Sequence, residues 1–133
     1  MDRVAIERLI RAAYTTRARG DVQAIKALFT HHPRLELAGS PEASPAAGHA
    51  EGGPGFEAML TSMVDTWEWQ EHTVLAILID GNRAAAHWRA RLRHTGKDET
   101  VETEAVDLFL IEDGKIASLV EFCDTALAAK LMA

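Results

Sequence analysis

Hydrophobic and polar residues follow two different periods along this chain. Up to about residue 67, apolar residues recur every three or four positions, the pattern of helices that bury one face. From about residue 72 onward they recur at every second position, the pattern of strands that bury one face. Helices followed by a run of consecutive strands predict an α+β domain with a mostly antiparallel sheet.

The first half of the chain is expected to form three helices and one short strand. Asp2 and Asp21 are favourable helix N-caps, and Gly20 is a favourable end for the first helix. The segment 30–33, which contains His-His-Pro, is expected to break the second helix, and 39–55, rich in Gly, Pro, Ala and Ser, is expected to be a loop. The helices are predicted at 3–19, 22–29 and 56–67, and the strand at 34–38.

The second half is expected to form four strands and a short terminal helix. The segment 80–82, Asp-Gly-Asn, is typical of a hairpin turn, and Asp124 is suited to cap the terminal helix through its side chain. The strands are predicted at 72–79, 83–94, 101–111 and 116–123, and the helix at 126–132.

One residue of the strand at 101–111 conflicts with the pattern around it. Because side chains alternate between faces, Asp107 shares the apolar face with Ala105 and Phe109, and it is the only carboxylate there. A carboxyl group in apolar surroundings tends to keep its proton, because burial penalises the charged form. Two interpretations follow: Asp107 is a neutral hydrogen-bond donor in a pocket, or it is a structural residue that caps a turn or accepts a backbone N–H.

A second carboxyl group is expected on the same side of the sheet. In the last strand Glu121 alternates in step with Leu119, so both face inward if Leu119 does. The strand at 83–94 contributes Trp88 and Ala90 to this inner face. The sequence therefore predicts two carboxyl groups in one cavity.

The outer face of the last two strands is too apolar for solvent. A face of this kind is typical of an interface between subunits, so a homodimer is expected. The residues predicted to form the interface are Val106, Leu108, Val120 and Phe122.

Composition narrows the function classes. With 133 residues the chain is long enough for one core, so residues 1–133 are expected to form a single domain. A net charge of −6 argues against nucleic acid as a partner, and no apolar run approaches the roughly 20 residues of a membrane span. The single cysteine, Cys123, and a charged N-terminal segment without signal-peptide character favour a cytoplasmic location. No phosphate-binding loop, CxxC, HExxH or GxSxG motif is present, so neither a cofactor nor a metal is expected.

Several short motifs resemble one known superfamily when they are taken in order. They are Ala-Tyr at 13–14, Arg-Gly-Asp-Val-Gln-Ala-Ile-Lys-Ala-Leu-Phe at 19–29, Glu-Ala-Val-Asp-Leu-Phe at 104–109, Asp-Gly-Lys-Ile at 113–116 and Glu-Phe-Cys-Asp at 121–124. Together they resemble the SnoaL-like and ketosteroid-isomerase-like proteins, which share the cone-shaped fold of the nuclear-transport-factor-2-like type. The resemblance covers residues 3–127 and implies a curved, mostly antiparallel sheet wrapped around N-terminal helices, with a single central cavity.

The resemblance also implies roles for particular residues. Tyr14 and Asp107 fall at the two oxyanion-hole positions of ketosteroid isomerases, and Glu121 aligns with an acid of the epoxide-hydrolase-like members. Leu37 falls where the isomerases carry their proton-moving acid, which argues against a standard ketosteroid isomerase. The expected catalytic set is thus Tyr14 and a neutral Asp107 as donors and an ionised Glu121 as base. The residues expected to contact the substrate are Leu37, His49, Met63, Trp67, Trp88, Ala90, Phe109 and Cys123.

Two functions are compatible with this site. The first is cofactor-free acid–base catalysis, such as isomerisation, cyclisation, dehydration or hydrolysis, on a small apolar metabolite that bears a carbonyl or hydroxyl group. The second is a non-catalytic ligand-binding or accessory domain, because one fold serves many functions and the usual base is absent.

Overall fold

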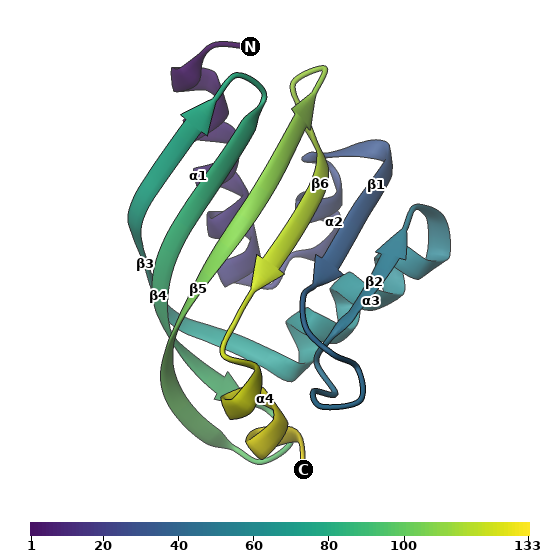
Figure 1. The fold of residues 1–133 in the computed structure, drawn as a ribbon, viewed down its shortest axis with the longest axis vertical. Coiled ribbons are helices and arrows are strands. Elements are labelled where there is room, and N and C mark those ends of the chain that lie inside the picture. Colours follow the sequence, from purple (N-terminus) through teal and green to yellow (C-terminus); the bar gives the residue numbers. More distant parts are fainter.

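The computed structural model describes residues 1–133, which form a curved, open sheet of six strands with helices along one face and at one end (Figure 1). In chain order the elements are α1 (Arg3–Arg19), α2 (Val22–Lys26), β1 (Phe29–Leu37), β2 (Gly48–Glu51), α3 (Gly53–Thr66), β3 (Trp67–Asp80), β4 (Arg83–His94), β5 (Glu99–Glu112), β6 (Lys115–Phe122) and α4 (Thr125–Met132). The α+β class predicted from the two periods is confirmed.

The helix ends carry the caps that the sequence predicted. The Asp2 side chain accepts a hydrogen bond from the Ala5 N–H, and the Asp124 side chain accepts one from the Leu127 N–H at the start of α4. Gly20 ends α1 with φ of 70°, a left-handed conformation that glycine adopts without the steric cost of a Cβ atom.

The strand order in the sheet is β2-β1-β6-β5-β4-β3. Strands β3 to β6 form the expected antiparallel meander, whereas β1 pairs with β6 in parallel. This one parallel pairing sets Leu37 of β1 beside Glu121 of β6, which in turn lies opposite Asp107 of β5. One row across the sheet therefore joins the three positions that the resemblance singled out.

Three predictions for the first half are wrong. The second helix ends at Lys26 rather than 29, and the expected break at 30–33 is part of β1. The pairing of β1 with β6 shifts register between Phe29 and Arg34, and a proline is tolerated at such an irregularity because no ladder donor is needed there. The predicted loop 39–55 contains β2, an edge strand, and the first residues of α3.

The core lies between the concave face of the sheet and helices α1 and α3. Its most deeply buried members come from both layers, among them Ile6 and Ile10 of α1, Ala86 of β4 and Ile116 of β6. No helix of the structure is long and apolar enough to cross a membrane. The same packing leaves a cavity whose lining includes Leu127 and Ala128 of α4, the helix that follows the end of β6 (Figure 1).

Candidate functional site

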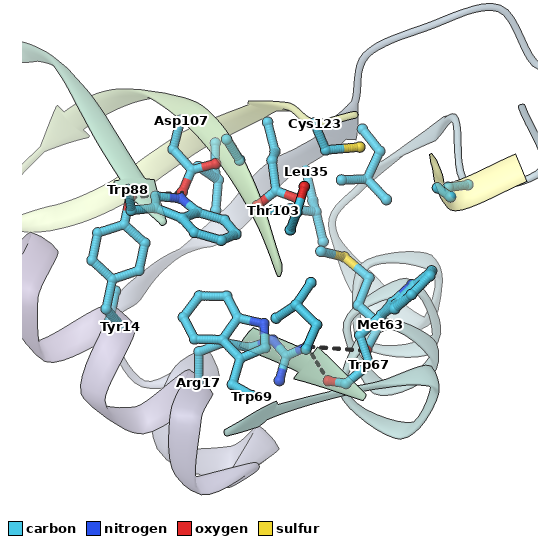
Figure 2. A pocket seen from close by; sticks show the side chains of 18 of the residues that line it. Tyr14, Arg17, Leu35, Met63, Trp67, Trp69, Trp88, Thr103, Asp107 and Cys123 are labelled. Atoms are coloured by element: carbon cyan, nitrogen blue, oxygen red, sulfur yellow. Dashed lines mark hydrogen bonds between the residues drawn. The ribbon is translucent and has the colours of Figure 1, made fainter. Parts of the chain in front are cut away.

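A cavity of about 110 Å³ opens between the sheet, α1, α3 and α4, and 20 of its 25 lining residues are hydrophobic, so a ligand bound there would be mainly apolar (Figure 2). The polar side chains in its wall are few. They are Tyr14, Arg17, Thr103, Asp107, Glu121 and Asp124.

Asp107 is held by two donors from different elements. The Tyr14 hydroxyl on α1 lies 2.6 Å from Oδ2 of Asp107, and Trp88 Nε1 on β4 donates to the same oxygen at 2.8 Å. Tyr14 and Asp107 are only 7% and 1% exposed, so both hydrogen bonds are shielded from water. The second oxygen, Oδ1, is buried and accepts no hydrogen bond from an N–H group or a hydroxyl group of the protein. Asp107 is therefore oriented through Oδ2, and apart from Tyr14 and Trp88 its one hydrogen-bonding neighbour is the carboxyl group of Glu121.

Glu121 and Asp107 act on each other as a carboxyl pair in which Asp107 is fully buried and Glu121 is half-buried. They are directly opposite in the antiparallel register of β5 and β6, and both line the cavity. Burial raises the pKa of each carboxyl group, and the charge of Asp107 raises the pKa of Glu121 further. The hydrogen bonds from Tyr14 and Trp88 act in the opposite direction on the pKa of Asp107, because they stabilise its charged form.

These contacts change the proton assignment expected from the sequence. A carboxylate oxygen that accepts from two buried donors is stabilised as an anion, whereas Glu121 has no comparable donors. Glu121 therefore holds its proton more tightly than Asp107 does, and Asp107 is the carboxyl group of the pair that ionises first. The sequence predicted the reverse, a neutral Asp107 and an ionised Glu121. The alternation of side chains along a strand shows which face Asp107 is on. It does not show that Tyr14 and Trp88 donate their hydrogen bonds to Asp107 rather than into the cavity.

Aromatic rings form one wall beside the pair. His72 stacks on Trp69 with ring centroids 4.4 Å apart and lies 4.6 Å from the Tyr14 ring, while Trp69 and Trp88 are 5.0 Å apart. Burial lowers the pKa of His72 to about 4, so this imidazole is neutral at physiological pH. The wall thus offers flat apolar surface on which a conjugated or aromatic ligand can pack.

Most of the residues expected to contact a substrate lie around the cavity, and two do not. Ala90 is buried in the core, and His49 is exposed on the edge strand β2. Burial raises the pKa of the Cys123 thiol to about 11, so it is a protonated lining group rather than a nucleophile. The members of the expected set that line the cavity are Leu37, Met63, Trp67, Trp88, Phe109 and Cys123, together with Tyr14, Asp107 and Glu121.

Sequence reasoning missed Arg17 as a site residue. It follows Tyr14 by three positions on α1 and lies on the same face of the helix. Its Nη2 atom donates to the backbone carbonyls of Met63 at 3.1 Å and Trp67 at 2.7 Å, and its guanidinium carbon lies 4.8 Å from the centre of the Trp69 ring. The sequence did contain a signal for this role, because Arg17 is a charged residue at a position on the apolar face of the predicted first helix.

Comparisons with known proteins agree on the fold. Residues 10–119 match the family model described as a SnoaL-like domain, whereas no curated protein matches the sequence. A proposed isomerase from Rhodopseudomonas palustris superposes with a TM-score of 0.80 at 14% identity, covering 99% of this chain and 98% of the other. An NTF2-like protein from Burkholderia xenovorans gives 0.79 at 19% identity over 100% and 99% of the two chains. A proposed polyketide cyclase from Xanthomonas campestris gives 0.76 at 18% identity over 98% of each. At such identities the superpositions establish the fold alone.

Proposed function

The chain belongs to the family of SnoaL-like domains, and on that premise we propose that its cavity binds a small, largely apolar metabolite that bears a carbonyl or hydroxyl group. We further propose that it acts on this metabolite by cofactor-free acid–base chemistry. The observation that carries the proposal is the Asp107–Glu121 pair, in which one carboxyl is held by two donors and the other faces it across the register.

The geometry supports different roles for the two acids, with Asp107 as the base and Glu121 as the acid. The free oxygen Oδ1 of Asp107 takes a proton from the carbon next to a substrate carbonyl, while Glu121 gives its proton to the carbonyl oxygen. The product is an enol in the apolar cavity. Return of a proton to a different carbon would complete an isomerisation, and attack of the enol carbon on a second carbonyl would complete an aldol-type cyclisation. Tyr14 and Trp88 hold Asp107 in place and moderate its basicity.

The register supports this assignment in a chain that lacks the usual first-strand acid. Leu37 sits beside Glu121 on the neighbouring strand, and Glu121 sits beside Asp107. A carboxyl group is therefore present one strand away from the position where related isomerases carry theirs. Glu121 lines the same cavity as Leu37, so proton transfer there does not require an acid on β1.

Deuterium exchange tests the proposal without knowledge of the natural substrate. Small ketones such as cyclohexenone and phenylacetone are incubated with the protein in D₂O, and loss of the α-proton signal is followed by NMR. We expect exchange faster than in buffer alone, and at least about 100-fold slower with Glu121→Gln, because an amide cannot give up a proton in this way. His49→Ala, on the exposed edge strand outside the cavity, is the matched control and should exchange like the unaltered protein.

The rival function is a non-catalytic ligand-binding domain, and Leu37 is the observation that favours it. If ketones and phenols bind in the cavity, as seen by shifts of the Tyr14 and Trp88 resonances, but no ketone of the panel exchanges, the rival function holds and the acid–base proposal is refuted.

A further inference from the structure

Arg17 is a cation in the cavity wall without an acidic partner. No Asp or Glu side chain lies within 4.0 Å of its guanidinium group, although eight other pairs in the structure meet that limit. Burial lowers the pKa of Arg17 to about 10, which leaves it charged at neutral pH. Glu121 attracts this charge through space but lies beyond ion-pair distance, so the half-buried guanidinium has no close counter-ion, which is unfavourable unless a ligand pairs with it.

The hydrogen bonds of Arg17 leave part of its guanidinium unused. Both backbone carbonyls that it contacts, those of Met63 and Trp67, bind the same nitrogen, Nη2. Nε and Nη1 donate to no protein atom, although together they carry three N–H groups. The Trp69 ring and the carbonyls of Met63 and Trp67 fix the plane of the group, so the free donors keep a defined direction.

Arg17 and Asp107 lie in different parts of the cavity wall, whereas Glu121 is close enough to Arg17 for their charges to interact. Figure 2 shows the Arg17 side chain beside Trp69 and Trp67, across the view from Asp107 and Cys123. The surface between them is aromatic and apolar, with Trp69 and Trp88 in contact. A ligand that reaches from one to the other needs an anionic end, a flat apolar middle and a reactive carbonyl end.

We propose that the ligand of this protein carries a carboxylate that binds the free N–H groups of Arg17, with its apolar part on Trp69 and Trp88 and its carbonyl group at Asp107 and Glu121. This inference rests on the proposed function for the placement of the carbonyl group. Arg17 then determines specificity: it selects apolar oxo acids over neutral ketones of the same size, because planar guanidinium groups pair well with carboxylates.

Pairs of probes with equal shape test the proposal. Phenylacetate is compared with phenylacetamide, and benzoate with benzamide, at pH about 7, with binding measured by calorimetry and by quenching of tryptophan fluorescence. We expect each carboxylate to bind at least about tenfold more tightly than its amide. In Arg17→Gln this ratio should fall to about one, because the amide side chain keeps donors but loses the charge. Arg17→Lys keeps the charge and should keep part of the preference for the carboxylate over the amide. This variant tests the proposal if Arg17→Gln does not fold.

Each outcome decides between the two proposals. Equal binding of acid and amide to the unaltered protein, or binding of neither at millimolar concentration, would overturn the carboxylate site. The same holds if Arg17→Gln unfolds at a lower temperature but keeps the ratio, because Arg17 would then only tie α1 to α3. Glu121→Gln should keep the ratio and lose the deuterium exchange. A preserved ratio without exchange in the unaltered protein would refute the acid–base function and leave the carboxylate site standing.

Discussion

At the scale of single residues, one oxygen atom organises the site. Oδ2 of Asp107 collects a donor from helix α1 and a donor from strand β4, and each donor comes from a side chain that also packs in the core. Removing either donor leaves the carboxylate less stabilised inside an apolar cavity. The ionisation of Asp107 is thus coupled to the packing of Tyr14 and Trp88.

Glu121 is expected to make stability depend on pH with a definite sign. Its folded pKa is raised above the ordinary value of about 4.3. Its contribution is fully present below that value and is lost as pH rises, because the unfolded chain releases the proton while the folded chain keeps it, at up to about 1.4 kcal/mol per pH unit. Glu121→Gln removes this contribution, so above about pH 5 the variant should gain stability relative to the unaltered protein, and the gain should grow as the pH rises.

Urea unfolding at several pH values measures this difference. His72, whose pKa is lowered to about 4, adds the opposite slope below pH about 6.5, but it is present in both proteins and drops out of the comparison. Glu104→Gln is the control, because that side chain is 57% exposed on the outer face. A difference for Glu121→Gln that does not grow with pH would show that Glu121 titrates as a solvated acid.

Both acids of the site could be placed from sequence parity, whereas their order of protonation and the presence of Arg17 in the cavity wall could not. Alternation along β5 and β6 puts Asp107 and Glu121 on the inner face, since a strand has only two faces. Which carboxyl keeps the proton depends on donors from α1 and β4, and those are tertiary contacts. Arg17 escaped notice because an arginine at the end of a helix usually faces solvent or the helix dipole.

At the scale of elements, the junction between β2 and α3 depends on a glycine. Gly52 caps α3 with φ of 62°, and its N–H donates to the Pro33 carbonyl of β1 at 2.7 Å. A Cβ atom at this position would collide with the His32 ring. The edge of the sheet and the start of α3 are thus packed so closely that only glycine fits.

Gly52→Ala should lower the free energy of unfolding by about 1–3 kcal/mol, because the backbone is strained and the imidazole must move. Gly48→Ala, in β2 with no atom near its would-be Cβ, should change it by less than about 0.5 kcal/mol. Chemical denaturation of both variants measures the difference. Equal stabilities would mean that the junction has room for a side chain.

The edge of the sheet formed by β1 and β2 was predicted poorly, because its sequence lacks a clear strand pattern. β2 has only four residues and no strand-like alternation of apolar residues, and its pairing with β1 defines it as a strand. The segment 30–33 belongs to β1, although the pairing of β1 with β6 is interrupted there. The long strands β4 and β5 were predicted closely because each buries one complete face along its length.

At the scale of the whole molecule, the convex face of the sheet carries two adjacent rows of residues that are apolar except for His87. One row runs through Leu78, Ala85, Leu108 and Val120, and the next through Ala76, His87, Val106 and Phe122. Several members are exposed, with Leu78 at 70%, Phe122 at 50% and Leu108 at 44%. A continuous exposed patch of this kind is unfavourable in water unless it is covered.

We propose that a second copy of the chain covers these rows, as the strand pattern predicted. Light scattering at low micromolar concentration should give twice the chain mass, with on the order of 1,000 Å² or more buried in total. Leu108→Glu should give a monomer, because a charge would be buried at the interface. Val4→Glu, on α1 away from the sheet face, should leave the mass unchanged. A monomeric unaltered protein would contradict the proposal.

Titration of the carboxyl groups by ¹³C NMR tests the central claim most directly, because it reports on Asp107 and Glu121 without any substrate. We expect the pair to release its protons in two separate steps, the second well above the ordinary range near pH ~4. Trp88→Phe, which removes one donor from Oδ2, should raise the first step, whereas Trp69→Phe, which makes no hydrogen bond to Asp107, should leave it in place. If both carboxyl groups instead titrate together near pH ~4, as solvated acids do, they do not share a proton and the acid–base account of this cavity is wrong.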